Sequence, residues 1–122
     1  MKQKLPERRQ FVRVDVPLRA VIETGGVKYE ILTKNISPVG LRFEIPEELD
    51  EGADLSISLF LLKREDPILL KGRVVWKQKV SLEDNAPYDT GIEITEINEE
   101  YKIVFLKYLC DLLYGSAYKA RT

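Results

Sequence analysis

The stretch LRAVIETGGVKYEIL, residues 18–32, alternates apolar and polar side chains on both sides of a glycine pair. The apolar members recur at every second position, which places them on one face of an extended chain; they are Leu18, Ala20, Ile22, Val27, Tyr29 and Ile31. Gly25 and Gly26 lie between the two halves, and glycine readily adopts the positive φ angles that two-residue turns require. We therefore expect a β-hairpin with one buried face.

Short segments with the same alternation follow the hairpin, at residues 41–45, 55–61, 68–80 and 89–97. Turn residues such as proline and glycine separate them, a pattern typical of an antiparallel β-fold. Within the longest segment, Val74 and Trp76 share one face, and we expect both of them in the core.

The periodicity changes after residue 97. Asn98 is a suitable N-cap, and Glu99 and Glu100 suit the positive end of a helix dipole. Apolar residues then recur at helical spacing and form one stripe: Tyr101, Phe105, Tyr108, Leu109 and Leu112. We expect a helix over about 98–114 that ends at Gly115, with its stripe in the core. A dimer interface is the alternative role for the stripe.

Six strands followed by one amphipathic helix predict a fold dominated by β-structure. The expected architecture is a six-stranded antiparallel β-barrel, with the C-terminal α-helix on its surface or over one opening. We divide the chain into a flexible N-terminal lead at 1–7, one domain at 8–115 and a C-terminal tail at 116–122. A length of 122 residues is enough for one such domain.

The composition argues against several classes of function. The chain contains no histidine and a single cysteine, Cys110, so it lacks the usual general base and the ligands of a zinc site. We expect no enzyme activity, no metal and no cofactor. No apolar run is long enough to span a membrane and no secretory signal is visible, so we expect a cytoplasmic protein.

Two short motifs stand out. Arg9 and Arg13 have the spacing RxxxR, of which composition alone predicts about 0.5 occurrences. Asn35, Ser37 and Gly40 form the pattern NxSxxG; when either Asp or Asn is allowed at its first position, composition predicts only about 0.02 occurrences. Asparagine and serine also stabilise turns through their own backbone, and a glycine here could be required for positive φ, so a purely local role is the alternative.

Taken together and in this order, the motifs resemble those of the PilZ domain, the bacterial receptor module for cyclic di-GMP. ERRQFVRV (7–14) is similar to the RxxxR segment of that family and NISPVG (35–40) to its [D/N]xSxxG motif. GRVVW (72–76) and GIEI (91–94) fall where the family has core strands. The resemblance covers nearly the whole chain and implies the same barrel with a C-terminal helix.

The resemblance also implies a ligand site made of residues from both motifs: Arg8, Arg9, Arg13, Asn35, Ser37 and Gly40. Arginine suits cyclic di-GMP because its guanidinium can bond phosphate or the O6/N7 edge of guanine, and can stack on a base. In the family, an arginine at the position of Arg8 accompanies two stacked ligand molecules. Arg73 is a further candidate contact from the barrel surface.

We therefore expect a non-enzymatic receptor for cyclic di-GMP that signals when ligand orders its N-terminal segment, as a monomer or homodimer with a downstream protein partner. A protein of the same fold that binds only proteins is one alternative. A small-barrel binder of single-stranded nucleic acid is another, although the net charge of −1 does not favour a partner of long nucleic acid.

Overall fold

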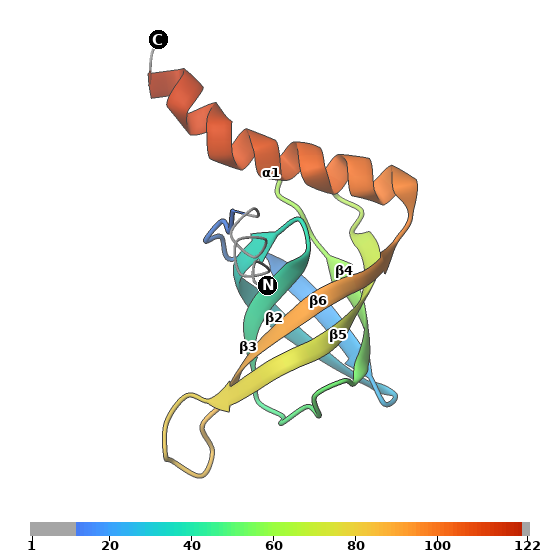
Figure 1. Cartoon of the computed structure of the whole chain (residues 1–122), viewed down its shortest axis with the longest axis vertical. Coiled ribbons are helices and arrows are strands. Elements are labelled where there is room, and N and C mark those ends of the chain that lie inside the picture. The colour runs from blue at the N-terminus through green and yellow to red at the C-terminus, as the bar shows by residue number, and fades with distance from the viewer. Residues whose placement is uncertain (1–11, 121–122) are drawn as a thin grey trace, which may run out of the picture.

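The computed structural model describes the backbone of residues 12–120 and the side chains of residues 12–115. The chain forms six strands and one helix: β1 (Arg19–Thr24), β2 (Val27–Ser37), β3 (Gly40–Ile45), β4 (Asp54–Leu59), β5 (Ile68–Lys79), β6 (Tyr88–Ile97) and α1 (Glu99–Ala120). The strands close into an antiparallel barrel in the order β1-β2-β3-β6-β5-β4 (Figure 1). The predicted barrel with a C-terminal helix is confirmed.

The predicted hairpin is formed by β1 and β2. Thr24 pairs with Val27 across a two-residue turn, and Gly25 and Gly26 have φ angles of 58° and 79°. Both angles lie in the left-handed region, which residues with a Cβ atom rarely adopt. The local sequence therefore determines this turn.

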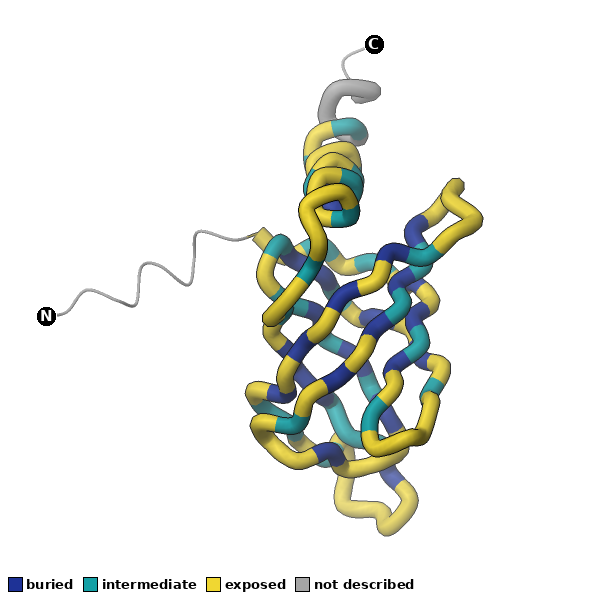
Figure 2. The backbone as a smooth tube through the Cα atoms, turned by 90° about the vertical axis from the view of Figure 1, so that its right-hand side faces the viewer, coloured by how far each residue is buried: buried dark blue, intermediate teal, exposed yellow. Residues whose placement is uncertain are grey.

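The alternating apolar residues fill the interior of the barrel and form its core. In Figure 2 buried and exposed positions alternate along the strands, as expected for a barrel with one inner face. Every strand and the helix contribute a buried hydrophobic residue, among them Ala20, Ile36, Phe43, Ile57, Val74, Ile92 and Phe105.

One buried polar side chain connects β2 to the segment that precedes β1. The hydroxyl of Thr33 accepts a hydrogen bond from the backbone N–H of Leu18 at 2.9 Å and donates one to the carbonyl of Val16 at 2.5 Å. Thr33 is only 3% exposed, so water cannot readily replace these bonds. Residues 16–18 are thereby held along β2.

Helix α1 begins as predicted and crosses one end of the barrel (Figure 1). The side-chain oxygen of Asn98 accepts a hydrogen bond from the backbone N–H of Tyr101 at 2.9 Å, which is the expected N-cap geometry. Phe105 and Leu109 belong to the buried core. The apolar stripe thus closes this end of the barrel.

The predicted end of the helix is wrong. Helix α1 continues through Gly115 to Ala120, so residues 116–120 are helical instead of forming a tail. Gly115 does not have a positive φ, and a glycine inside a helix costs only about 1 kcal/mol relative to alanine. That cost is too small to end a helix on its own. Helix α1, the one helix in residues 12–120, lacks the apolar length to cross a membrane.

Candidate functional site

The N-terminal segment lies beside the NxSxxG turn. Val14 and Ile36 form an isolated antiparallel bridge with two backbone hydrogen bonds of 2.8 and 2.9 Å. In this antiparallel register Arg13 lies opposite Ser37, and Arg13 and Asn35 both line one surface hollow of about 190 Å³. Ser37 and Gly40 line the same hollow.

The structure therefore brings together four of the residues predicted for the site, from segments more than twenty positions apart. Arg8 and Arg9, together with the lead at 1–7, lie outside the described residues. No group of acidic, cysteine or histidine side chains within the described part of the chain is arranged to hold a metal ion.

Ser37 has a role in the turn itself. Its hydroxyl oxygen accepts hydrogen bonds from the backbone N–H groups of Val39 and Gly40, both at 3.2 Å, and Ser37 is 6% exposed. These bonds hold the β2–β3 turn in shape. The local role considered for this motif is thus present, in a turn that also forms one wall of the hollow.

Gly40 is required for a reason that the sequence did not indicate. It does not have a positive φ, so the left-handed backbone considered in the alternative, local interpretation is not present. Instead, a Cβ atom at this position would lie 2.3 Å from the carbonyl oxygen of Ile92. Strand β6 passes so close to β3 here that no side chain fits between them.

Two residues that the sequence analysis did not single out for the site also line the hollow: Arg42 of β3 and Trp76 of β5. The guanidinium of Arg42 lies over the ring of Trp76, at 5.6 Å from its centroid. On its other side, Arg42 donates hydrogen bonds from Nε and Nη2 to the carboxylate of Asp89 in β6, the Nε bond measuring 3.0 Å.

The ion pair shifts the pKa of both partners. Hydrogen bonding to Arg42 holds the pKa of the Asp89 carboxyl below its ordinary value of 3.8, with smaller contributions from the charges of Arg42 and Lys34. The same bond raises the pKa of Arg42. Both groups therefore stay charged, and the guanidinium remains in one orientation.

Trp76 was expected in the core, and that prediction is wrong. A register shift between Val74 and Trp76 interrupts the pairing of β5 with β6, so the alternation changes after Val74. Trp76 is half-buried and lies on the outside of the barrel against Gly91. A bulge of this kind depends on the neighbouring strand and has no clear sign in the β5 sequence.

One weak indication of Arg42 is present in the sequence, because this arginine alternates with the apolar Leu41 and Phe43 directly after the motif.

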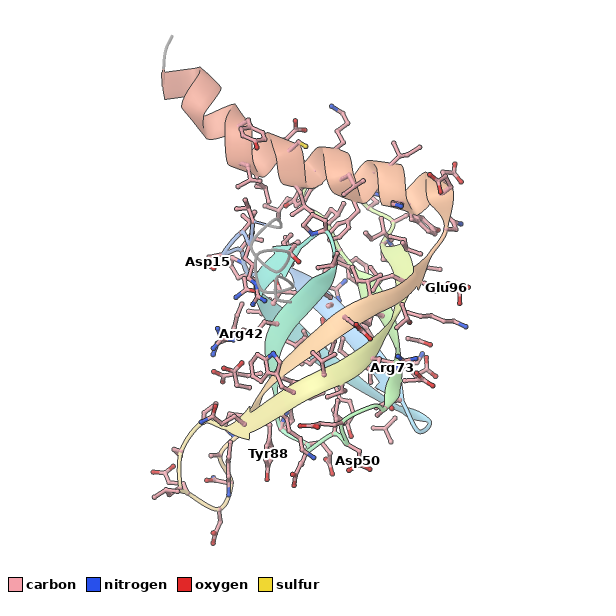
Figure 3. The ribbon with its side chains drawn as sticks, in the orientation of Figure 1. Asp15, Arg42, Asp50, Arg73, Tyr88 and Glu96 are labelled. Atoms are coloured by element: carbon pink, nitrogen blue, oxygen red, sulfur yellow. The ribbon has the colours of Figure 1, made fainter. Side chains whose placement is uncertain are left out.

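Arg73, the further candidate contact, lies elsewhere on β5. It forms ion pairs with Glu93 at 3.4 Å and with Asp54 at 3.9 Å, and it does not line the hollow. Figure 3 shows Arg42 and Arg73 on separate parts of the surface.

A second hollow, of about 410 Å³, is lined by residues of β1, β2, β4, β5, β6 and the start of α1. Its charged lining is mixed: Glu23, Lys28, Lys71 and Glu96. The smaller hollow has the more distinctive chemistry, because arginine, amide and indole groups from four elements converge there.

Fold and site together define a small antiparallel barrel whose N-terminal segment lies against an NxSxxG turn. The family model for the PilZ domain matches residues 7–110, and the chain belongs to this family. The predicted family and fold are thereby confirmed. A search of curated proteins finds no match.

Solved PilZ proteins have the same fold. The PilZ domain of YcgR from Escherichia coli, solved with c-di-GMP, is 14% identical with a TM-score of 0.67, covering 94% of this chain and 98% of that one. The MrkH–c-di-GMP complex from K. pneumonia is 17% identical with a TM-score of 0.72, covering 92% and 55%. The Bacillus subtilis inhibitor of motility, MotI, is 24% identical with a TM-score of 0.68, covering 83% and 48%. This chain thus spans about half the length of MrkH and of MotI.

Proposed function

We propose that this protein is a receptor for cyclic di-GMP and that it acts by binding, without catalysis. One observation carries the proposal: the Val14–Ile36 bridge sets Arg13 beside Asn35 and Ser37 in a shared hollow. Membership of the PilZ family supports it, as do the structures of YcgR and MrkH that contain c-di-GMP.

The chemistry of the hollow suits this ligand. Cyclic di-GMP has two phosphates and two guanines. Arg13 is exposed, so its guanidinium is accessible to a phosphate or to the O6/N7 edge of a guanine, which arginine can bond with two parallel N–H groups. Asn35 supplies an amide that can both donate and accept hydrogen bonds. Arg8 and Arg9 complete the proposed site, and Arg8 is assigned to a second, stacked ligand molecule.

The proposed signal is a change at the N-terminal segment. Arg8, Arg9 and Arg13 precede or adjoin the bridge at Val14, so a ligand held between them and the turn would fasten residues 8–13 to the barrel. Hydrogen exchange on residues 5–15, with and without cyclic di-GMP, measures this effect. Greater protection with ligand is expected, and equal protection in both states would contradict the mechanism. A downstream protein partner would recognise the fastened segment.

Titration calorimetry of the full chain with cyclic di-GMP tests the function. We expect saturable binding at physiological salt, with two ligand molecules per chain if Arg8 has its proposed role. Arg13→Ala should weaken binding by about 1.5–3 kcal/mol, the value of charge-assisted hydrogen bonds, or about 10- to 150-fold. Arg64→Ala, which removes an exposed arginine outside the hollow, is the control and should bind as the unaltered chain does.

An absence of binding would refute the proposal. It would favour a member of the fold that contacts only other proteins. Binding of a single-stranded oligonucleotide in place of the dinucleotide would instead favour the nucleic-acid interpretation, and a steep salt dependence would accompany it.

A further inference from the structure

One row of paired residues runs across four strands at the hollow. Asn35 of β2 pairs with Arg42 of β3, Arg42 pairs with Gly91 of β6, and Gly91 pairs with Trp76 of β5. Gly91 has no side chain, and a Cβ atom there would lie 2.2 Å from the indole Nε1 of Trp76. The indole can therefore lie across β6 and reach Arg42.

Arg42 is held from the next outward-facing position on β6. Asp89 engages Nε and Nη2 of its guanidinium, and the carboxylate side chain of Asp89 is only 14% exposed. Lys34 lies 3.6 Å from the same carboxylate and 2.9 Å from Glu44. These contacts leave the remaining amino group, Nη1, without a hydrogen bond to the described residues.

The position of Arg42 makes it accessible to a ligand. Its side chain is 37% exposed, and it borders both the 190 Å³ hollow and an adjoining one of about 480 Å³ that Asp15 and Lys34 also line. The guanidinium thus presents one donor and part of its surface at the place where the two hollows meet.

We infer that Arg42 is a further ligand-binding residue, with Trp76 behind it as an aromatic support and Asp89 as its positioning residue. The guanidinium forms a flat shelf on which one purine base of the ligand stacks, while Nη1 donates to an acceptor on the ligand. This inference rests on the proposed function and adds a base-recognition element to it.

Physical chemistry favours this role over a purely structural one. An ion pair with one partly exposed partner contributes only modestly to stability, so stability alone does not account for this arrangement. A guanidinium stacks on planar rings and loses little freedom on binding when its orientation is already set. Because Asp89 neutralises much of the charge of Arg42, the contribution of Arg42 to ligand binding depends on its planar geometry more than on its charge. Lysine therefore cannot replace it.

Trp76 is the only tryptophan in the chain, so tryptophan fluorescence reports on the surroundings of Trp76 and Arg42 alone. Cyclic di-GMP should change the emission saturably, with the same midpoint as calorimetry. Inorganic pyrophosphate, which has charge but no base, should leave it unchanged. Arg42→Ala and Arg42→Lys should each weaken cyclic di-GMP binding about 10-fold or more, as expected for a lost base stack. Asp89→Asn should weaken it about 3- to 10-fold.

The chain offers a matched control on β1. Arg19 forms an ion pair with Glu30 at 2.6 Å and lies over the ring of Phe60 at 4.0 Å, the same local arrangement away from the hollow. Arg19→Ala should bind within about twofold of the unaltered chain. Thermal melting of each variant separates a loss of binding from a loss of folding.

Two results would overturn the inference and leave the proposed function standing. The first is that Arg13→Ala weakens binding while both Arg42 variants bind normally. The second is that Arg42→Lys binds normally while Arg42→Ala does not, which would mean that only charge matters. A pyrophosphate response equal to that of cyclic di-GMP would also contradict base stacking. Failure of the unaltered chain to bind would refute the function itself.

Discussion

Replacing Gly40 by alanine should destabilise the barrel even when no ligand is present. Gly40 belongs to the NxSxxG motif, so a loss of binding in this variant could be mistaken for a lost ligand contact. The structure assigns it a different task, because it faces the carbonyl of Ile92 where β3 and β6 run side by side. The variant therefore separates a structural role from a direct binding role.

The expected magnitude follows from the geometry. A Cβ atom at residue 40 would lie 2.3 Å from the Ile92 oxygen, whereas real Cβ atoms keep at least 3.0 Å, so the strands must separate by about 0.7 Å or more. The 2.8 Å hydrogen bond from Ile94 N to the Val39 carbonyl would then lengthen to about 3.5 Å and be largely lost. Overpacking costs about 1–3 kcal/mol and a net hydrogen bond about 1 kcal/mol. We expect a loss of about 2–4 kcal/mol.

Thermal unfolding of the ligand-free chain is the assay. At this length, 1 kcal/mol corresponds to about 4 °C, so Gly40→Ala should lower Tm by about 8–16 °C. Gly115→Ala is the control, because its added Cβ would have no described atom within 4 Å apart from its chain neighbours and the backbone of its own helix, and alanine favours the helix by about 0.5–1 kcal/mol. Its Tm should rise by about 2–4 °C. A Gly40→Ala variant that melts with the unaltered chain would refute the argument.

Three further predictions concern stability. Thr33→Val leaves the buried N–H of Leu18 without its acceptor and should cost about 1–3 kcal/mol in urea unfolding; a neutral effect would contradict the role of the hydroxyl. Asn98→Ala removes the N-cap of α1 and should cost about 1 kcal/mol, measured as a fall in Tm of about 4 °C. Because Arg42 lowers the pKa of Asp89 from 3.8, their pair stabilises the folded chain above that pH and ceases to do so as the pH falls through the lower folded-state pKa. Asp89→Asn should therefore be less stable than the unaltered chain at pH 7 and equally stable in strong acid; a difference that persists in acid would sink this explanation.

The features that the sequence predicted well are local ones. The Gly25-Gly26 turn and the Asn98 cap each involve residues no more than three positions apart, so their conformations follow from the residues themselves. The alternation of apolar residues likewise indicates which face of each strand is buried, because the strand period is two. Joined to the two motifs, these signals were enough for the family and the barrel.

Two of the three errors share one origin. Trp76 lies outside the core because β5 bulges against β6. Gly40 is required because the backbone of Ile92 lies too close for a side chain, and α1 continues through Gly115 to Ala120. The first two depend on a strand that lies far away in the sequence and is brought alongside only by closure of the barrel. The third depends on how little one glycine costs within an established helix.

The strand and helix order, the buried face and the pair of motifs follow from the sequence alone, because each of these depends on neighbouring residues or on a simple period. Which side chains surround the hollow depends instead on how the strands are arranged in the closed barrel. Arg42 meets Asp89 across 47 positions and Trp76 across the intervening strand β6, and the bridge at Val14 sets Arg13 opposite Ser37 in the hollow that Asn35 also lines. Such contacts exist only after the barrel has closed, because the register of the paired strands brings their side chains together and local conformational preferences do not.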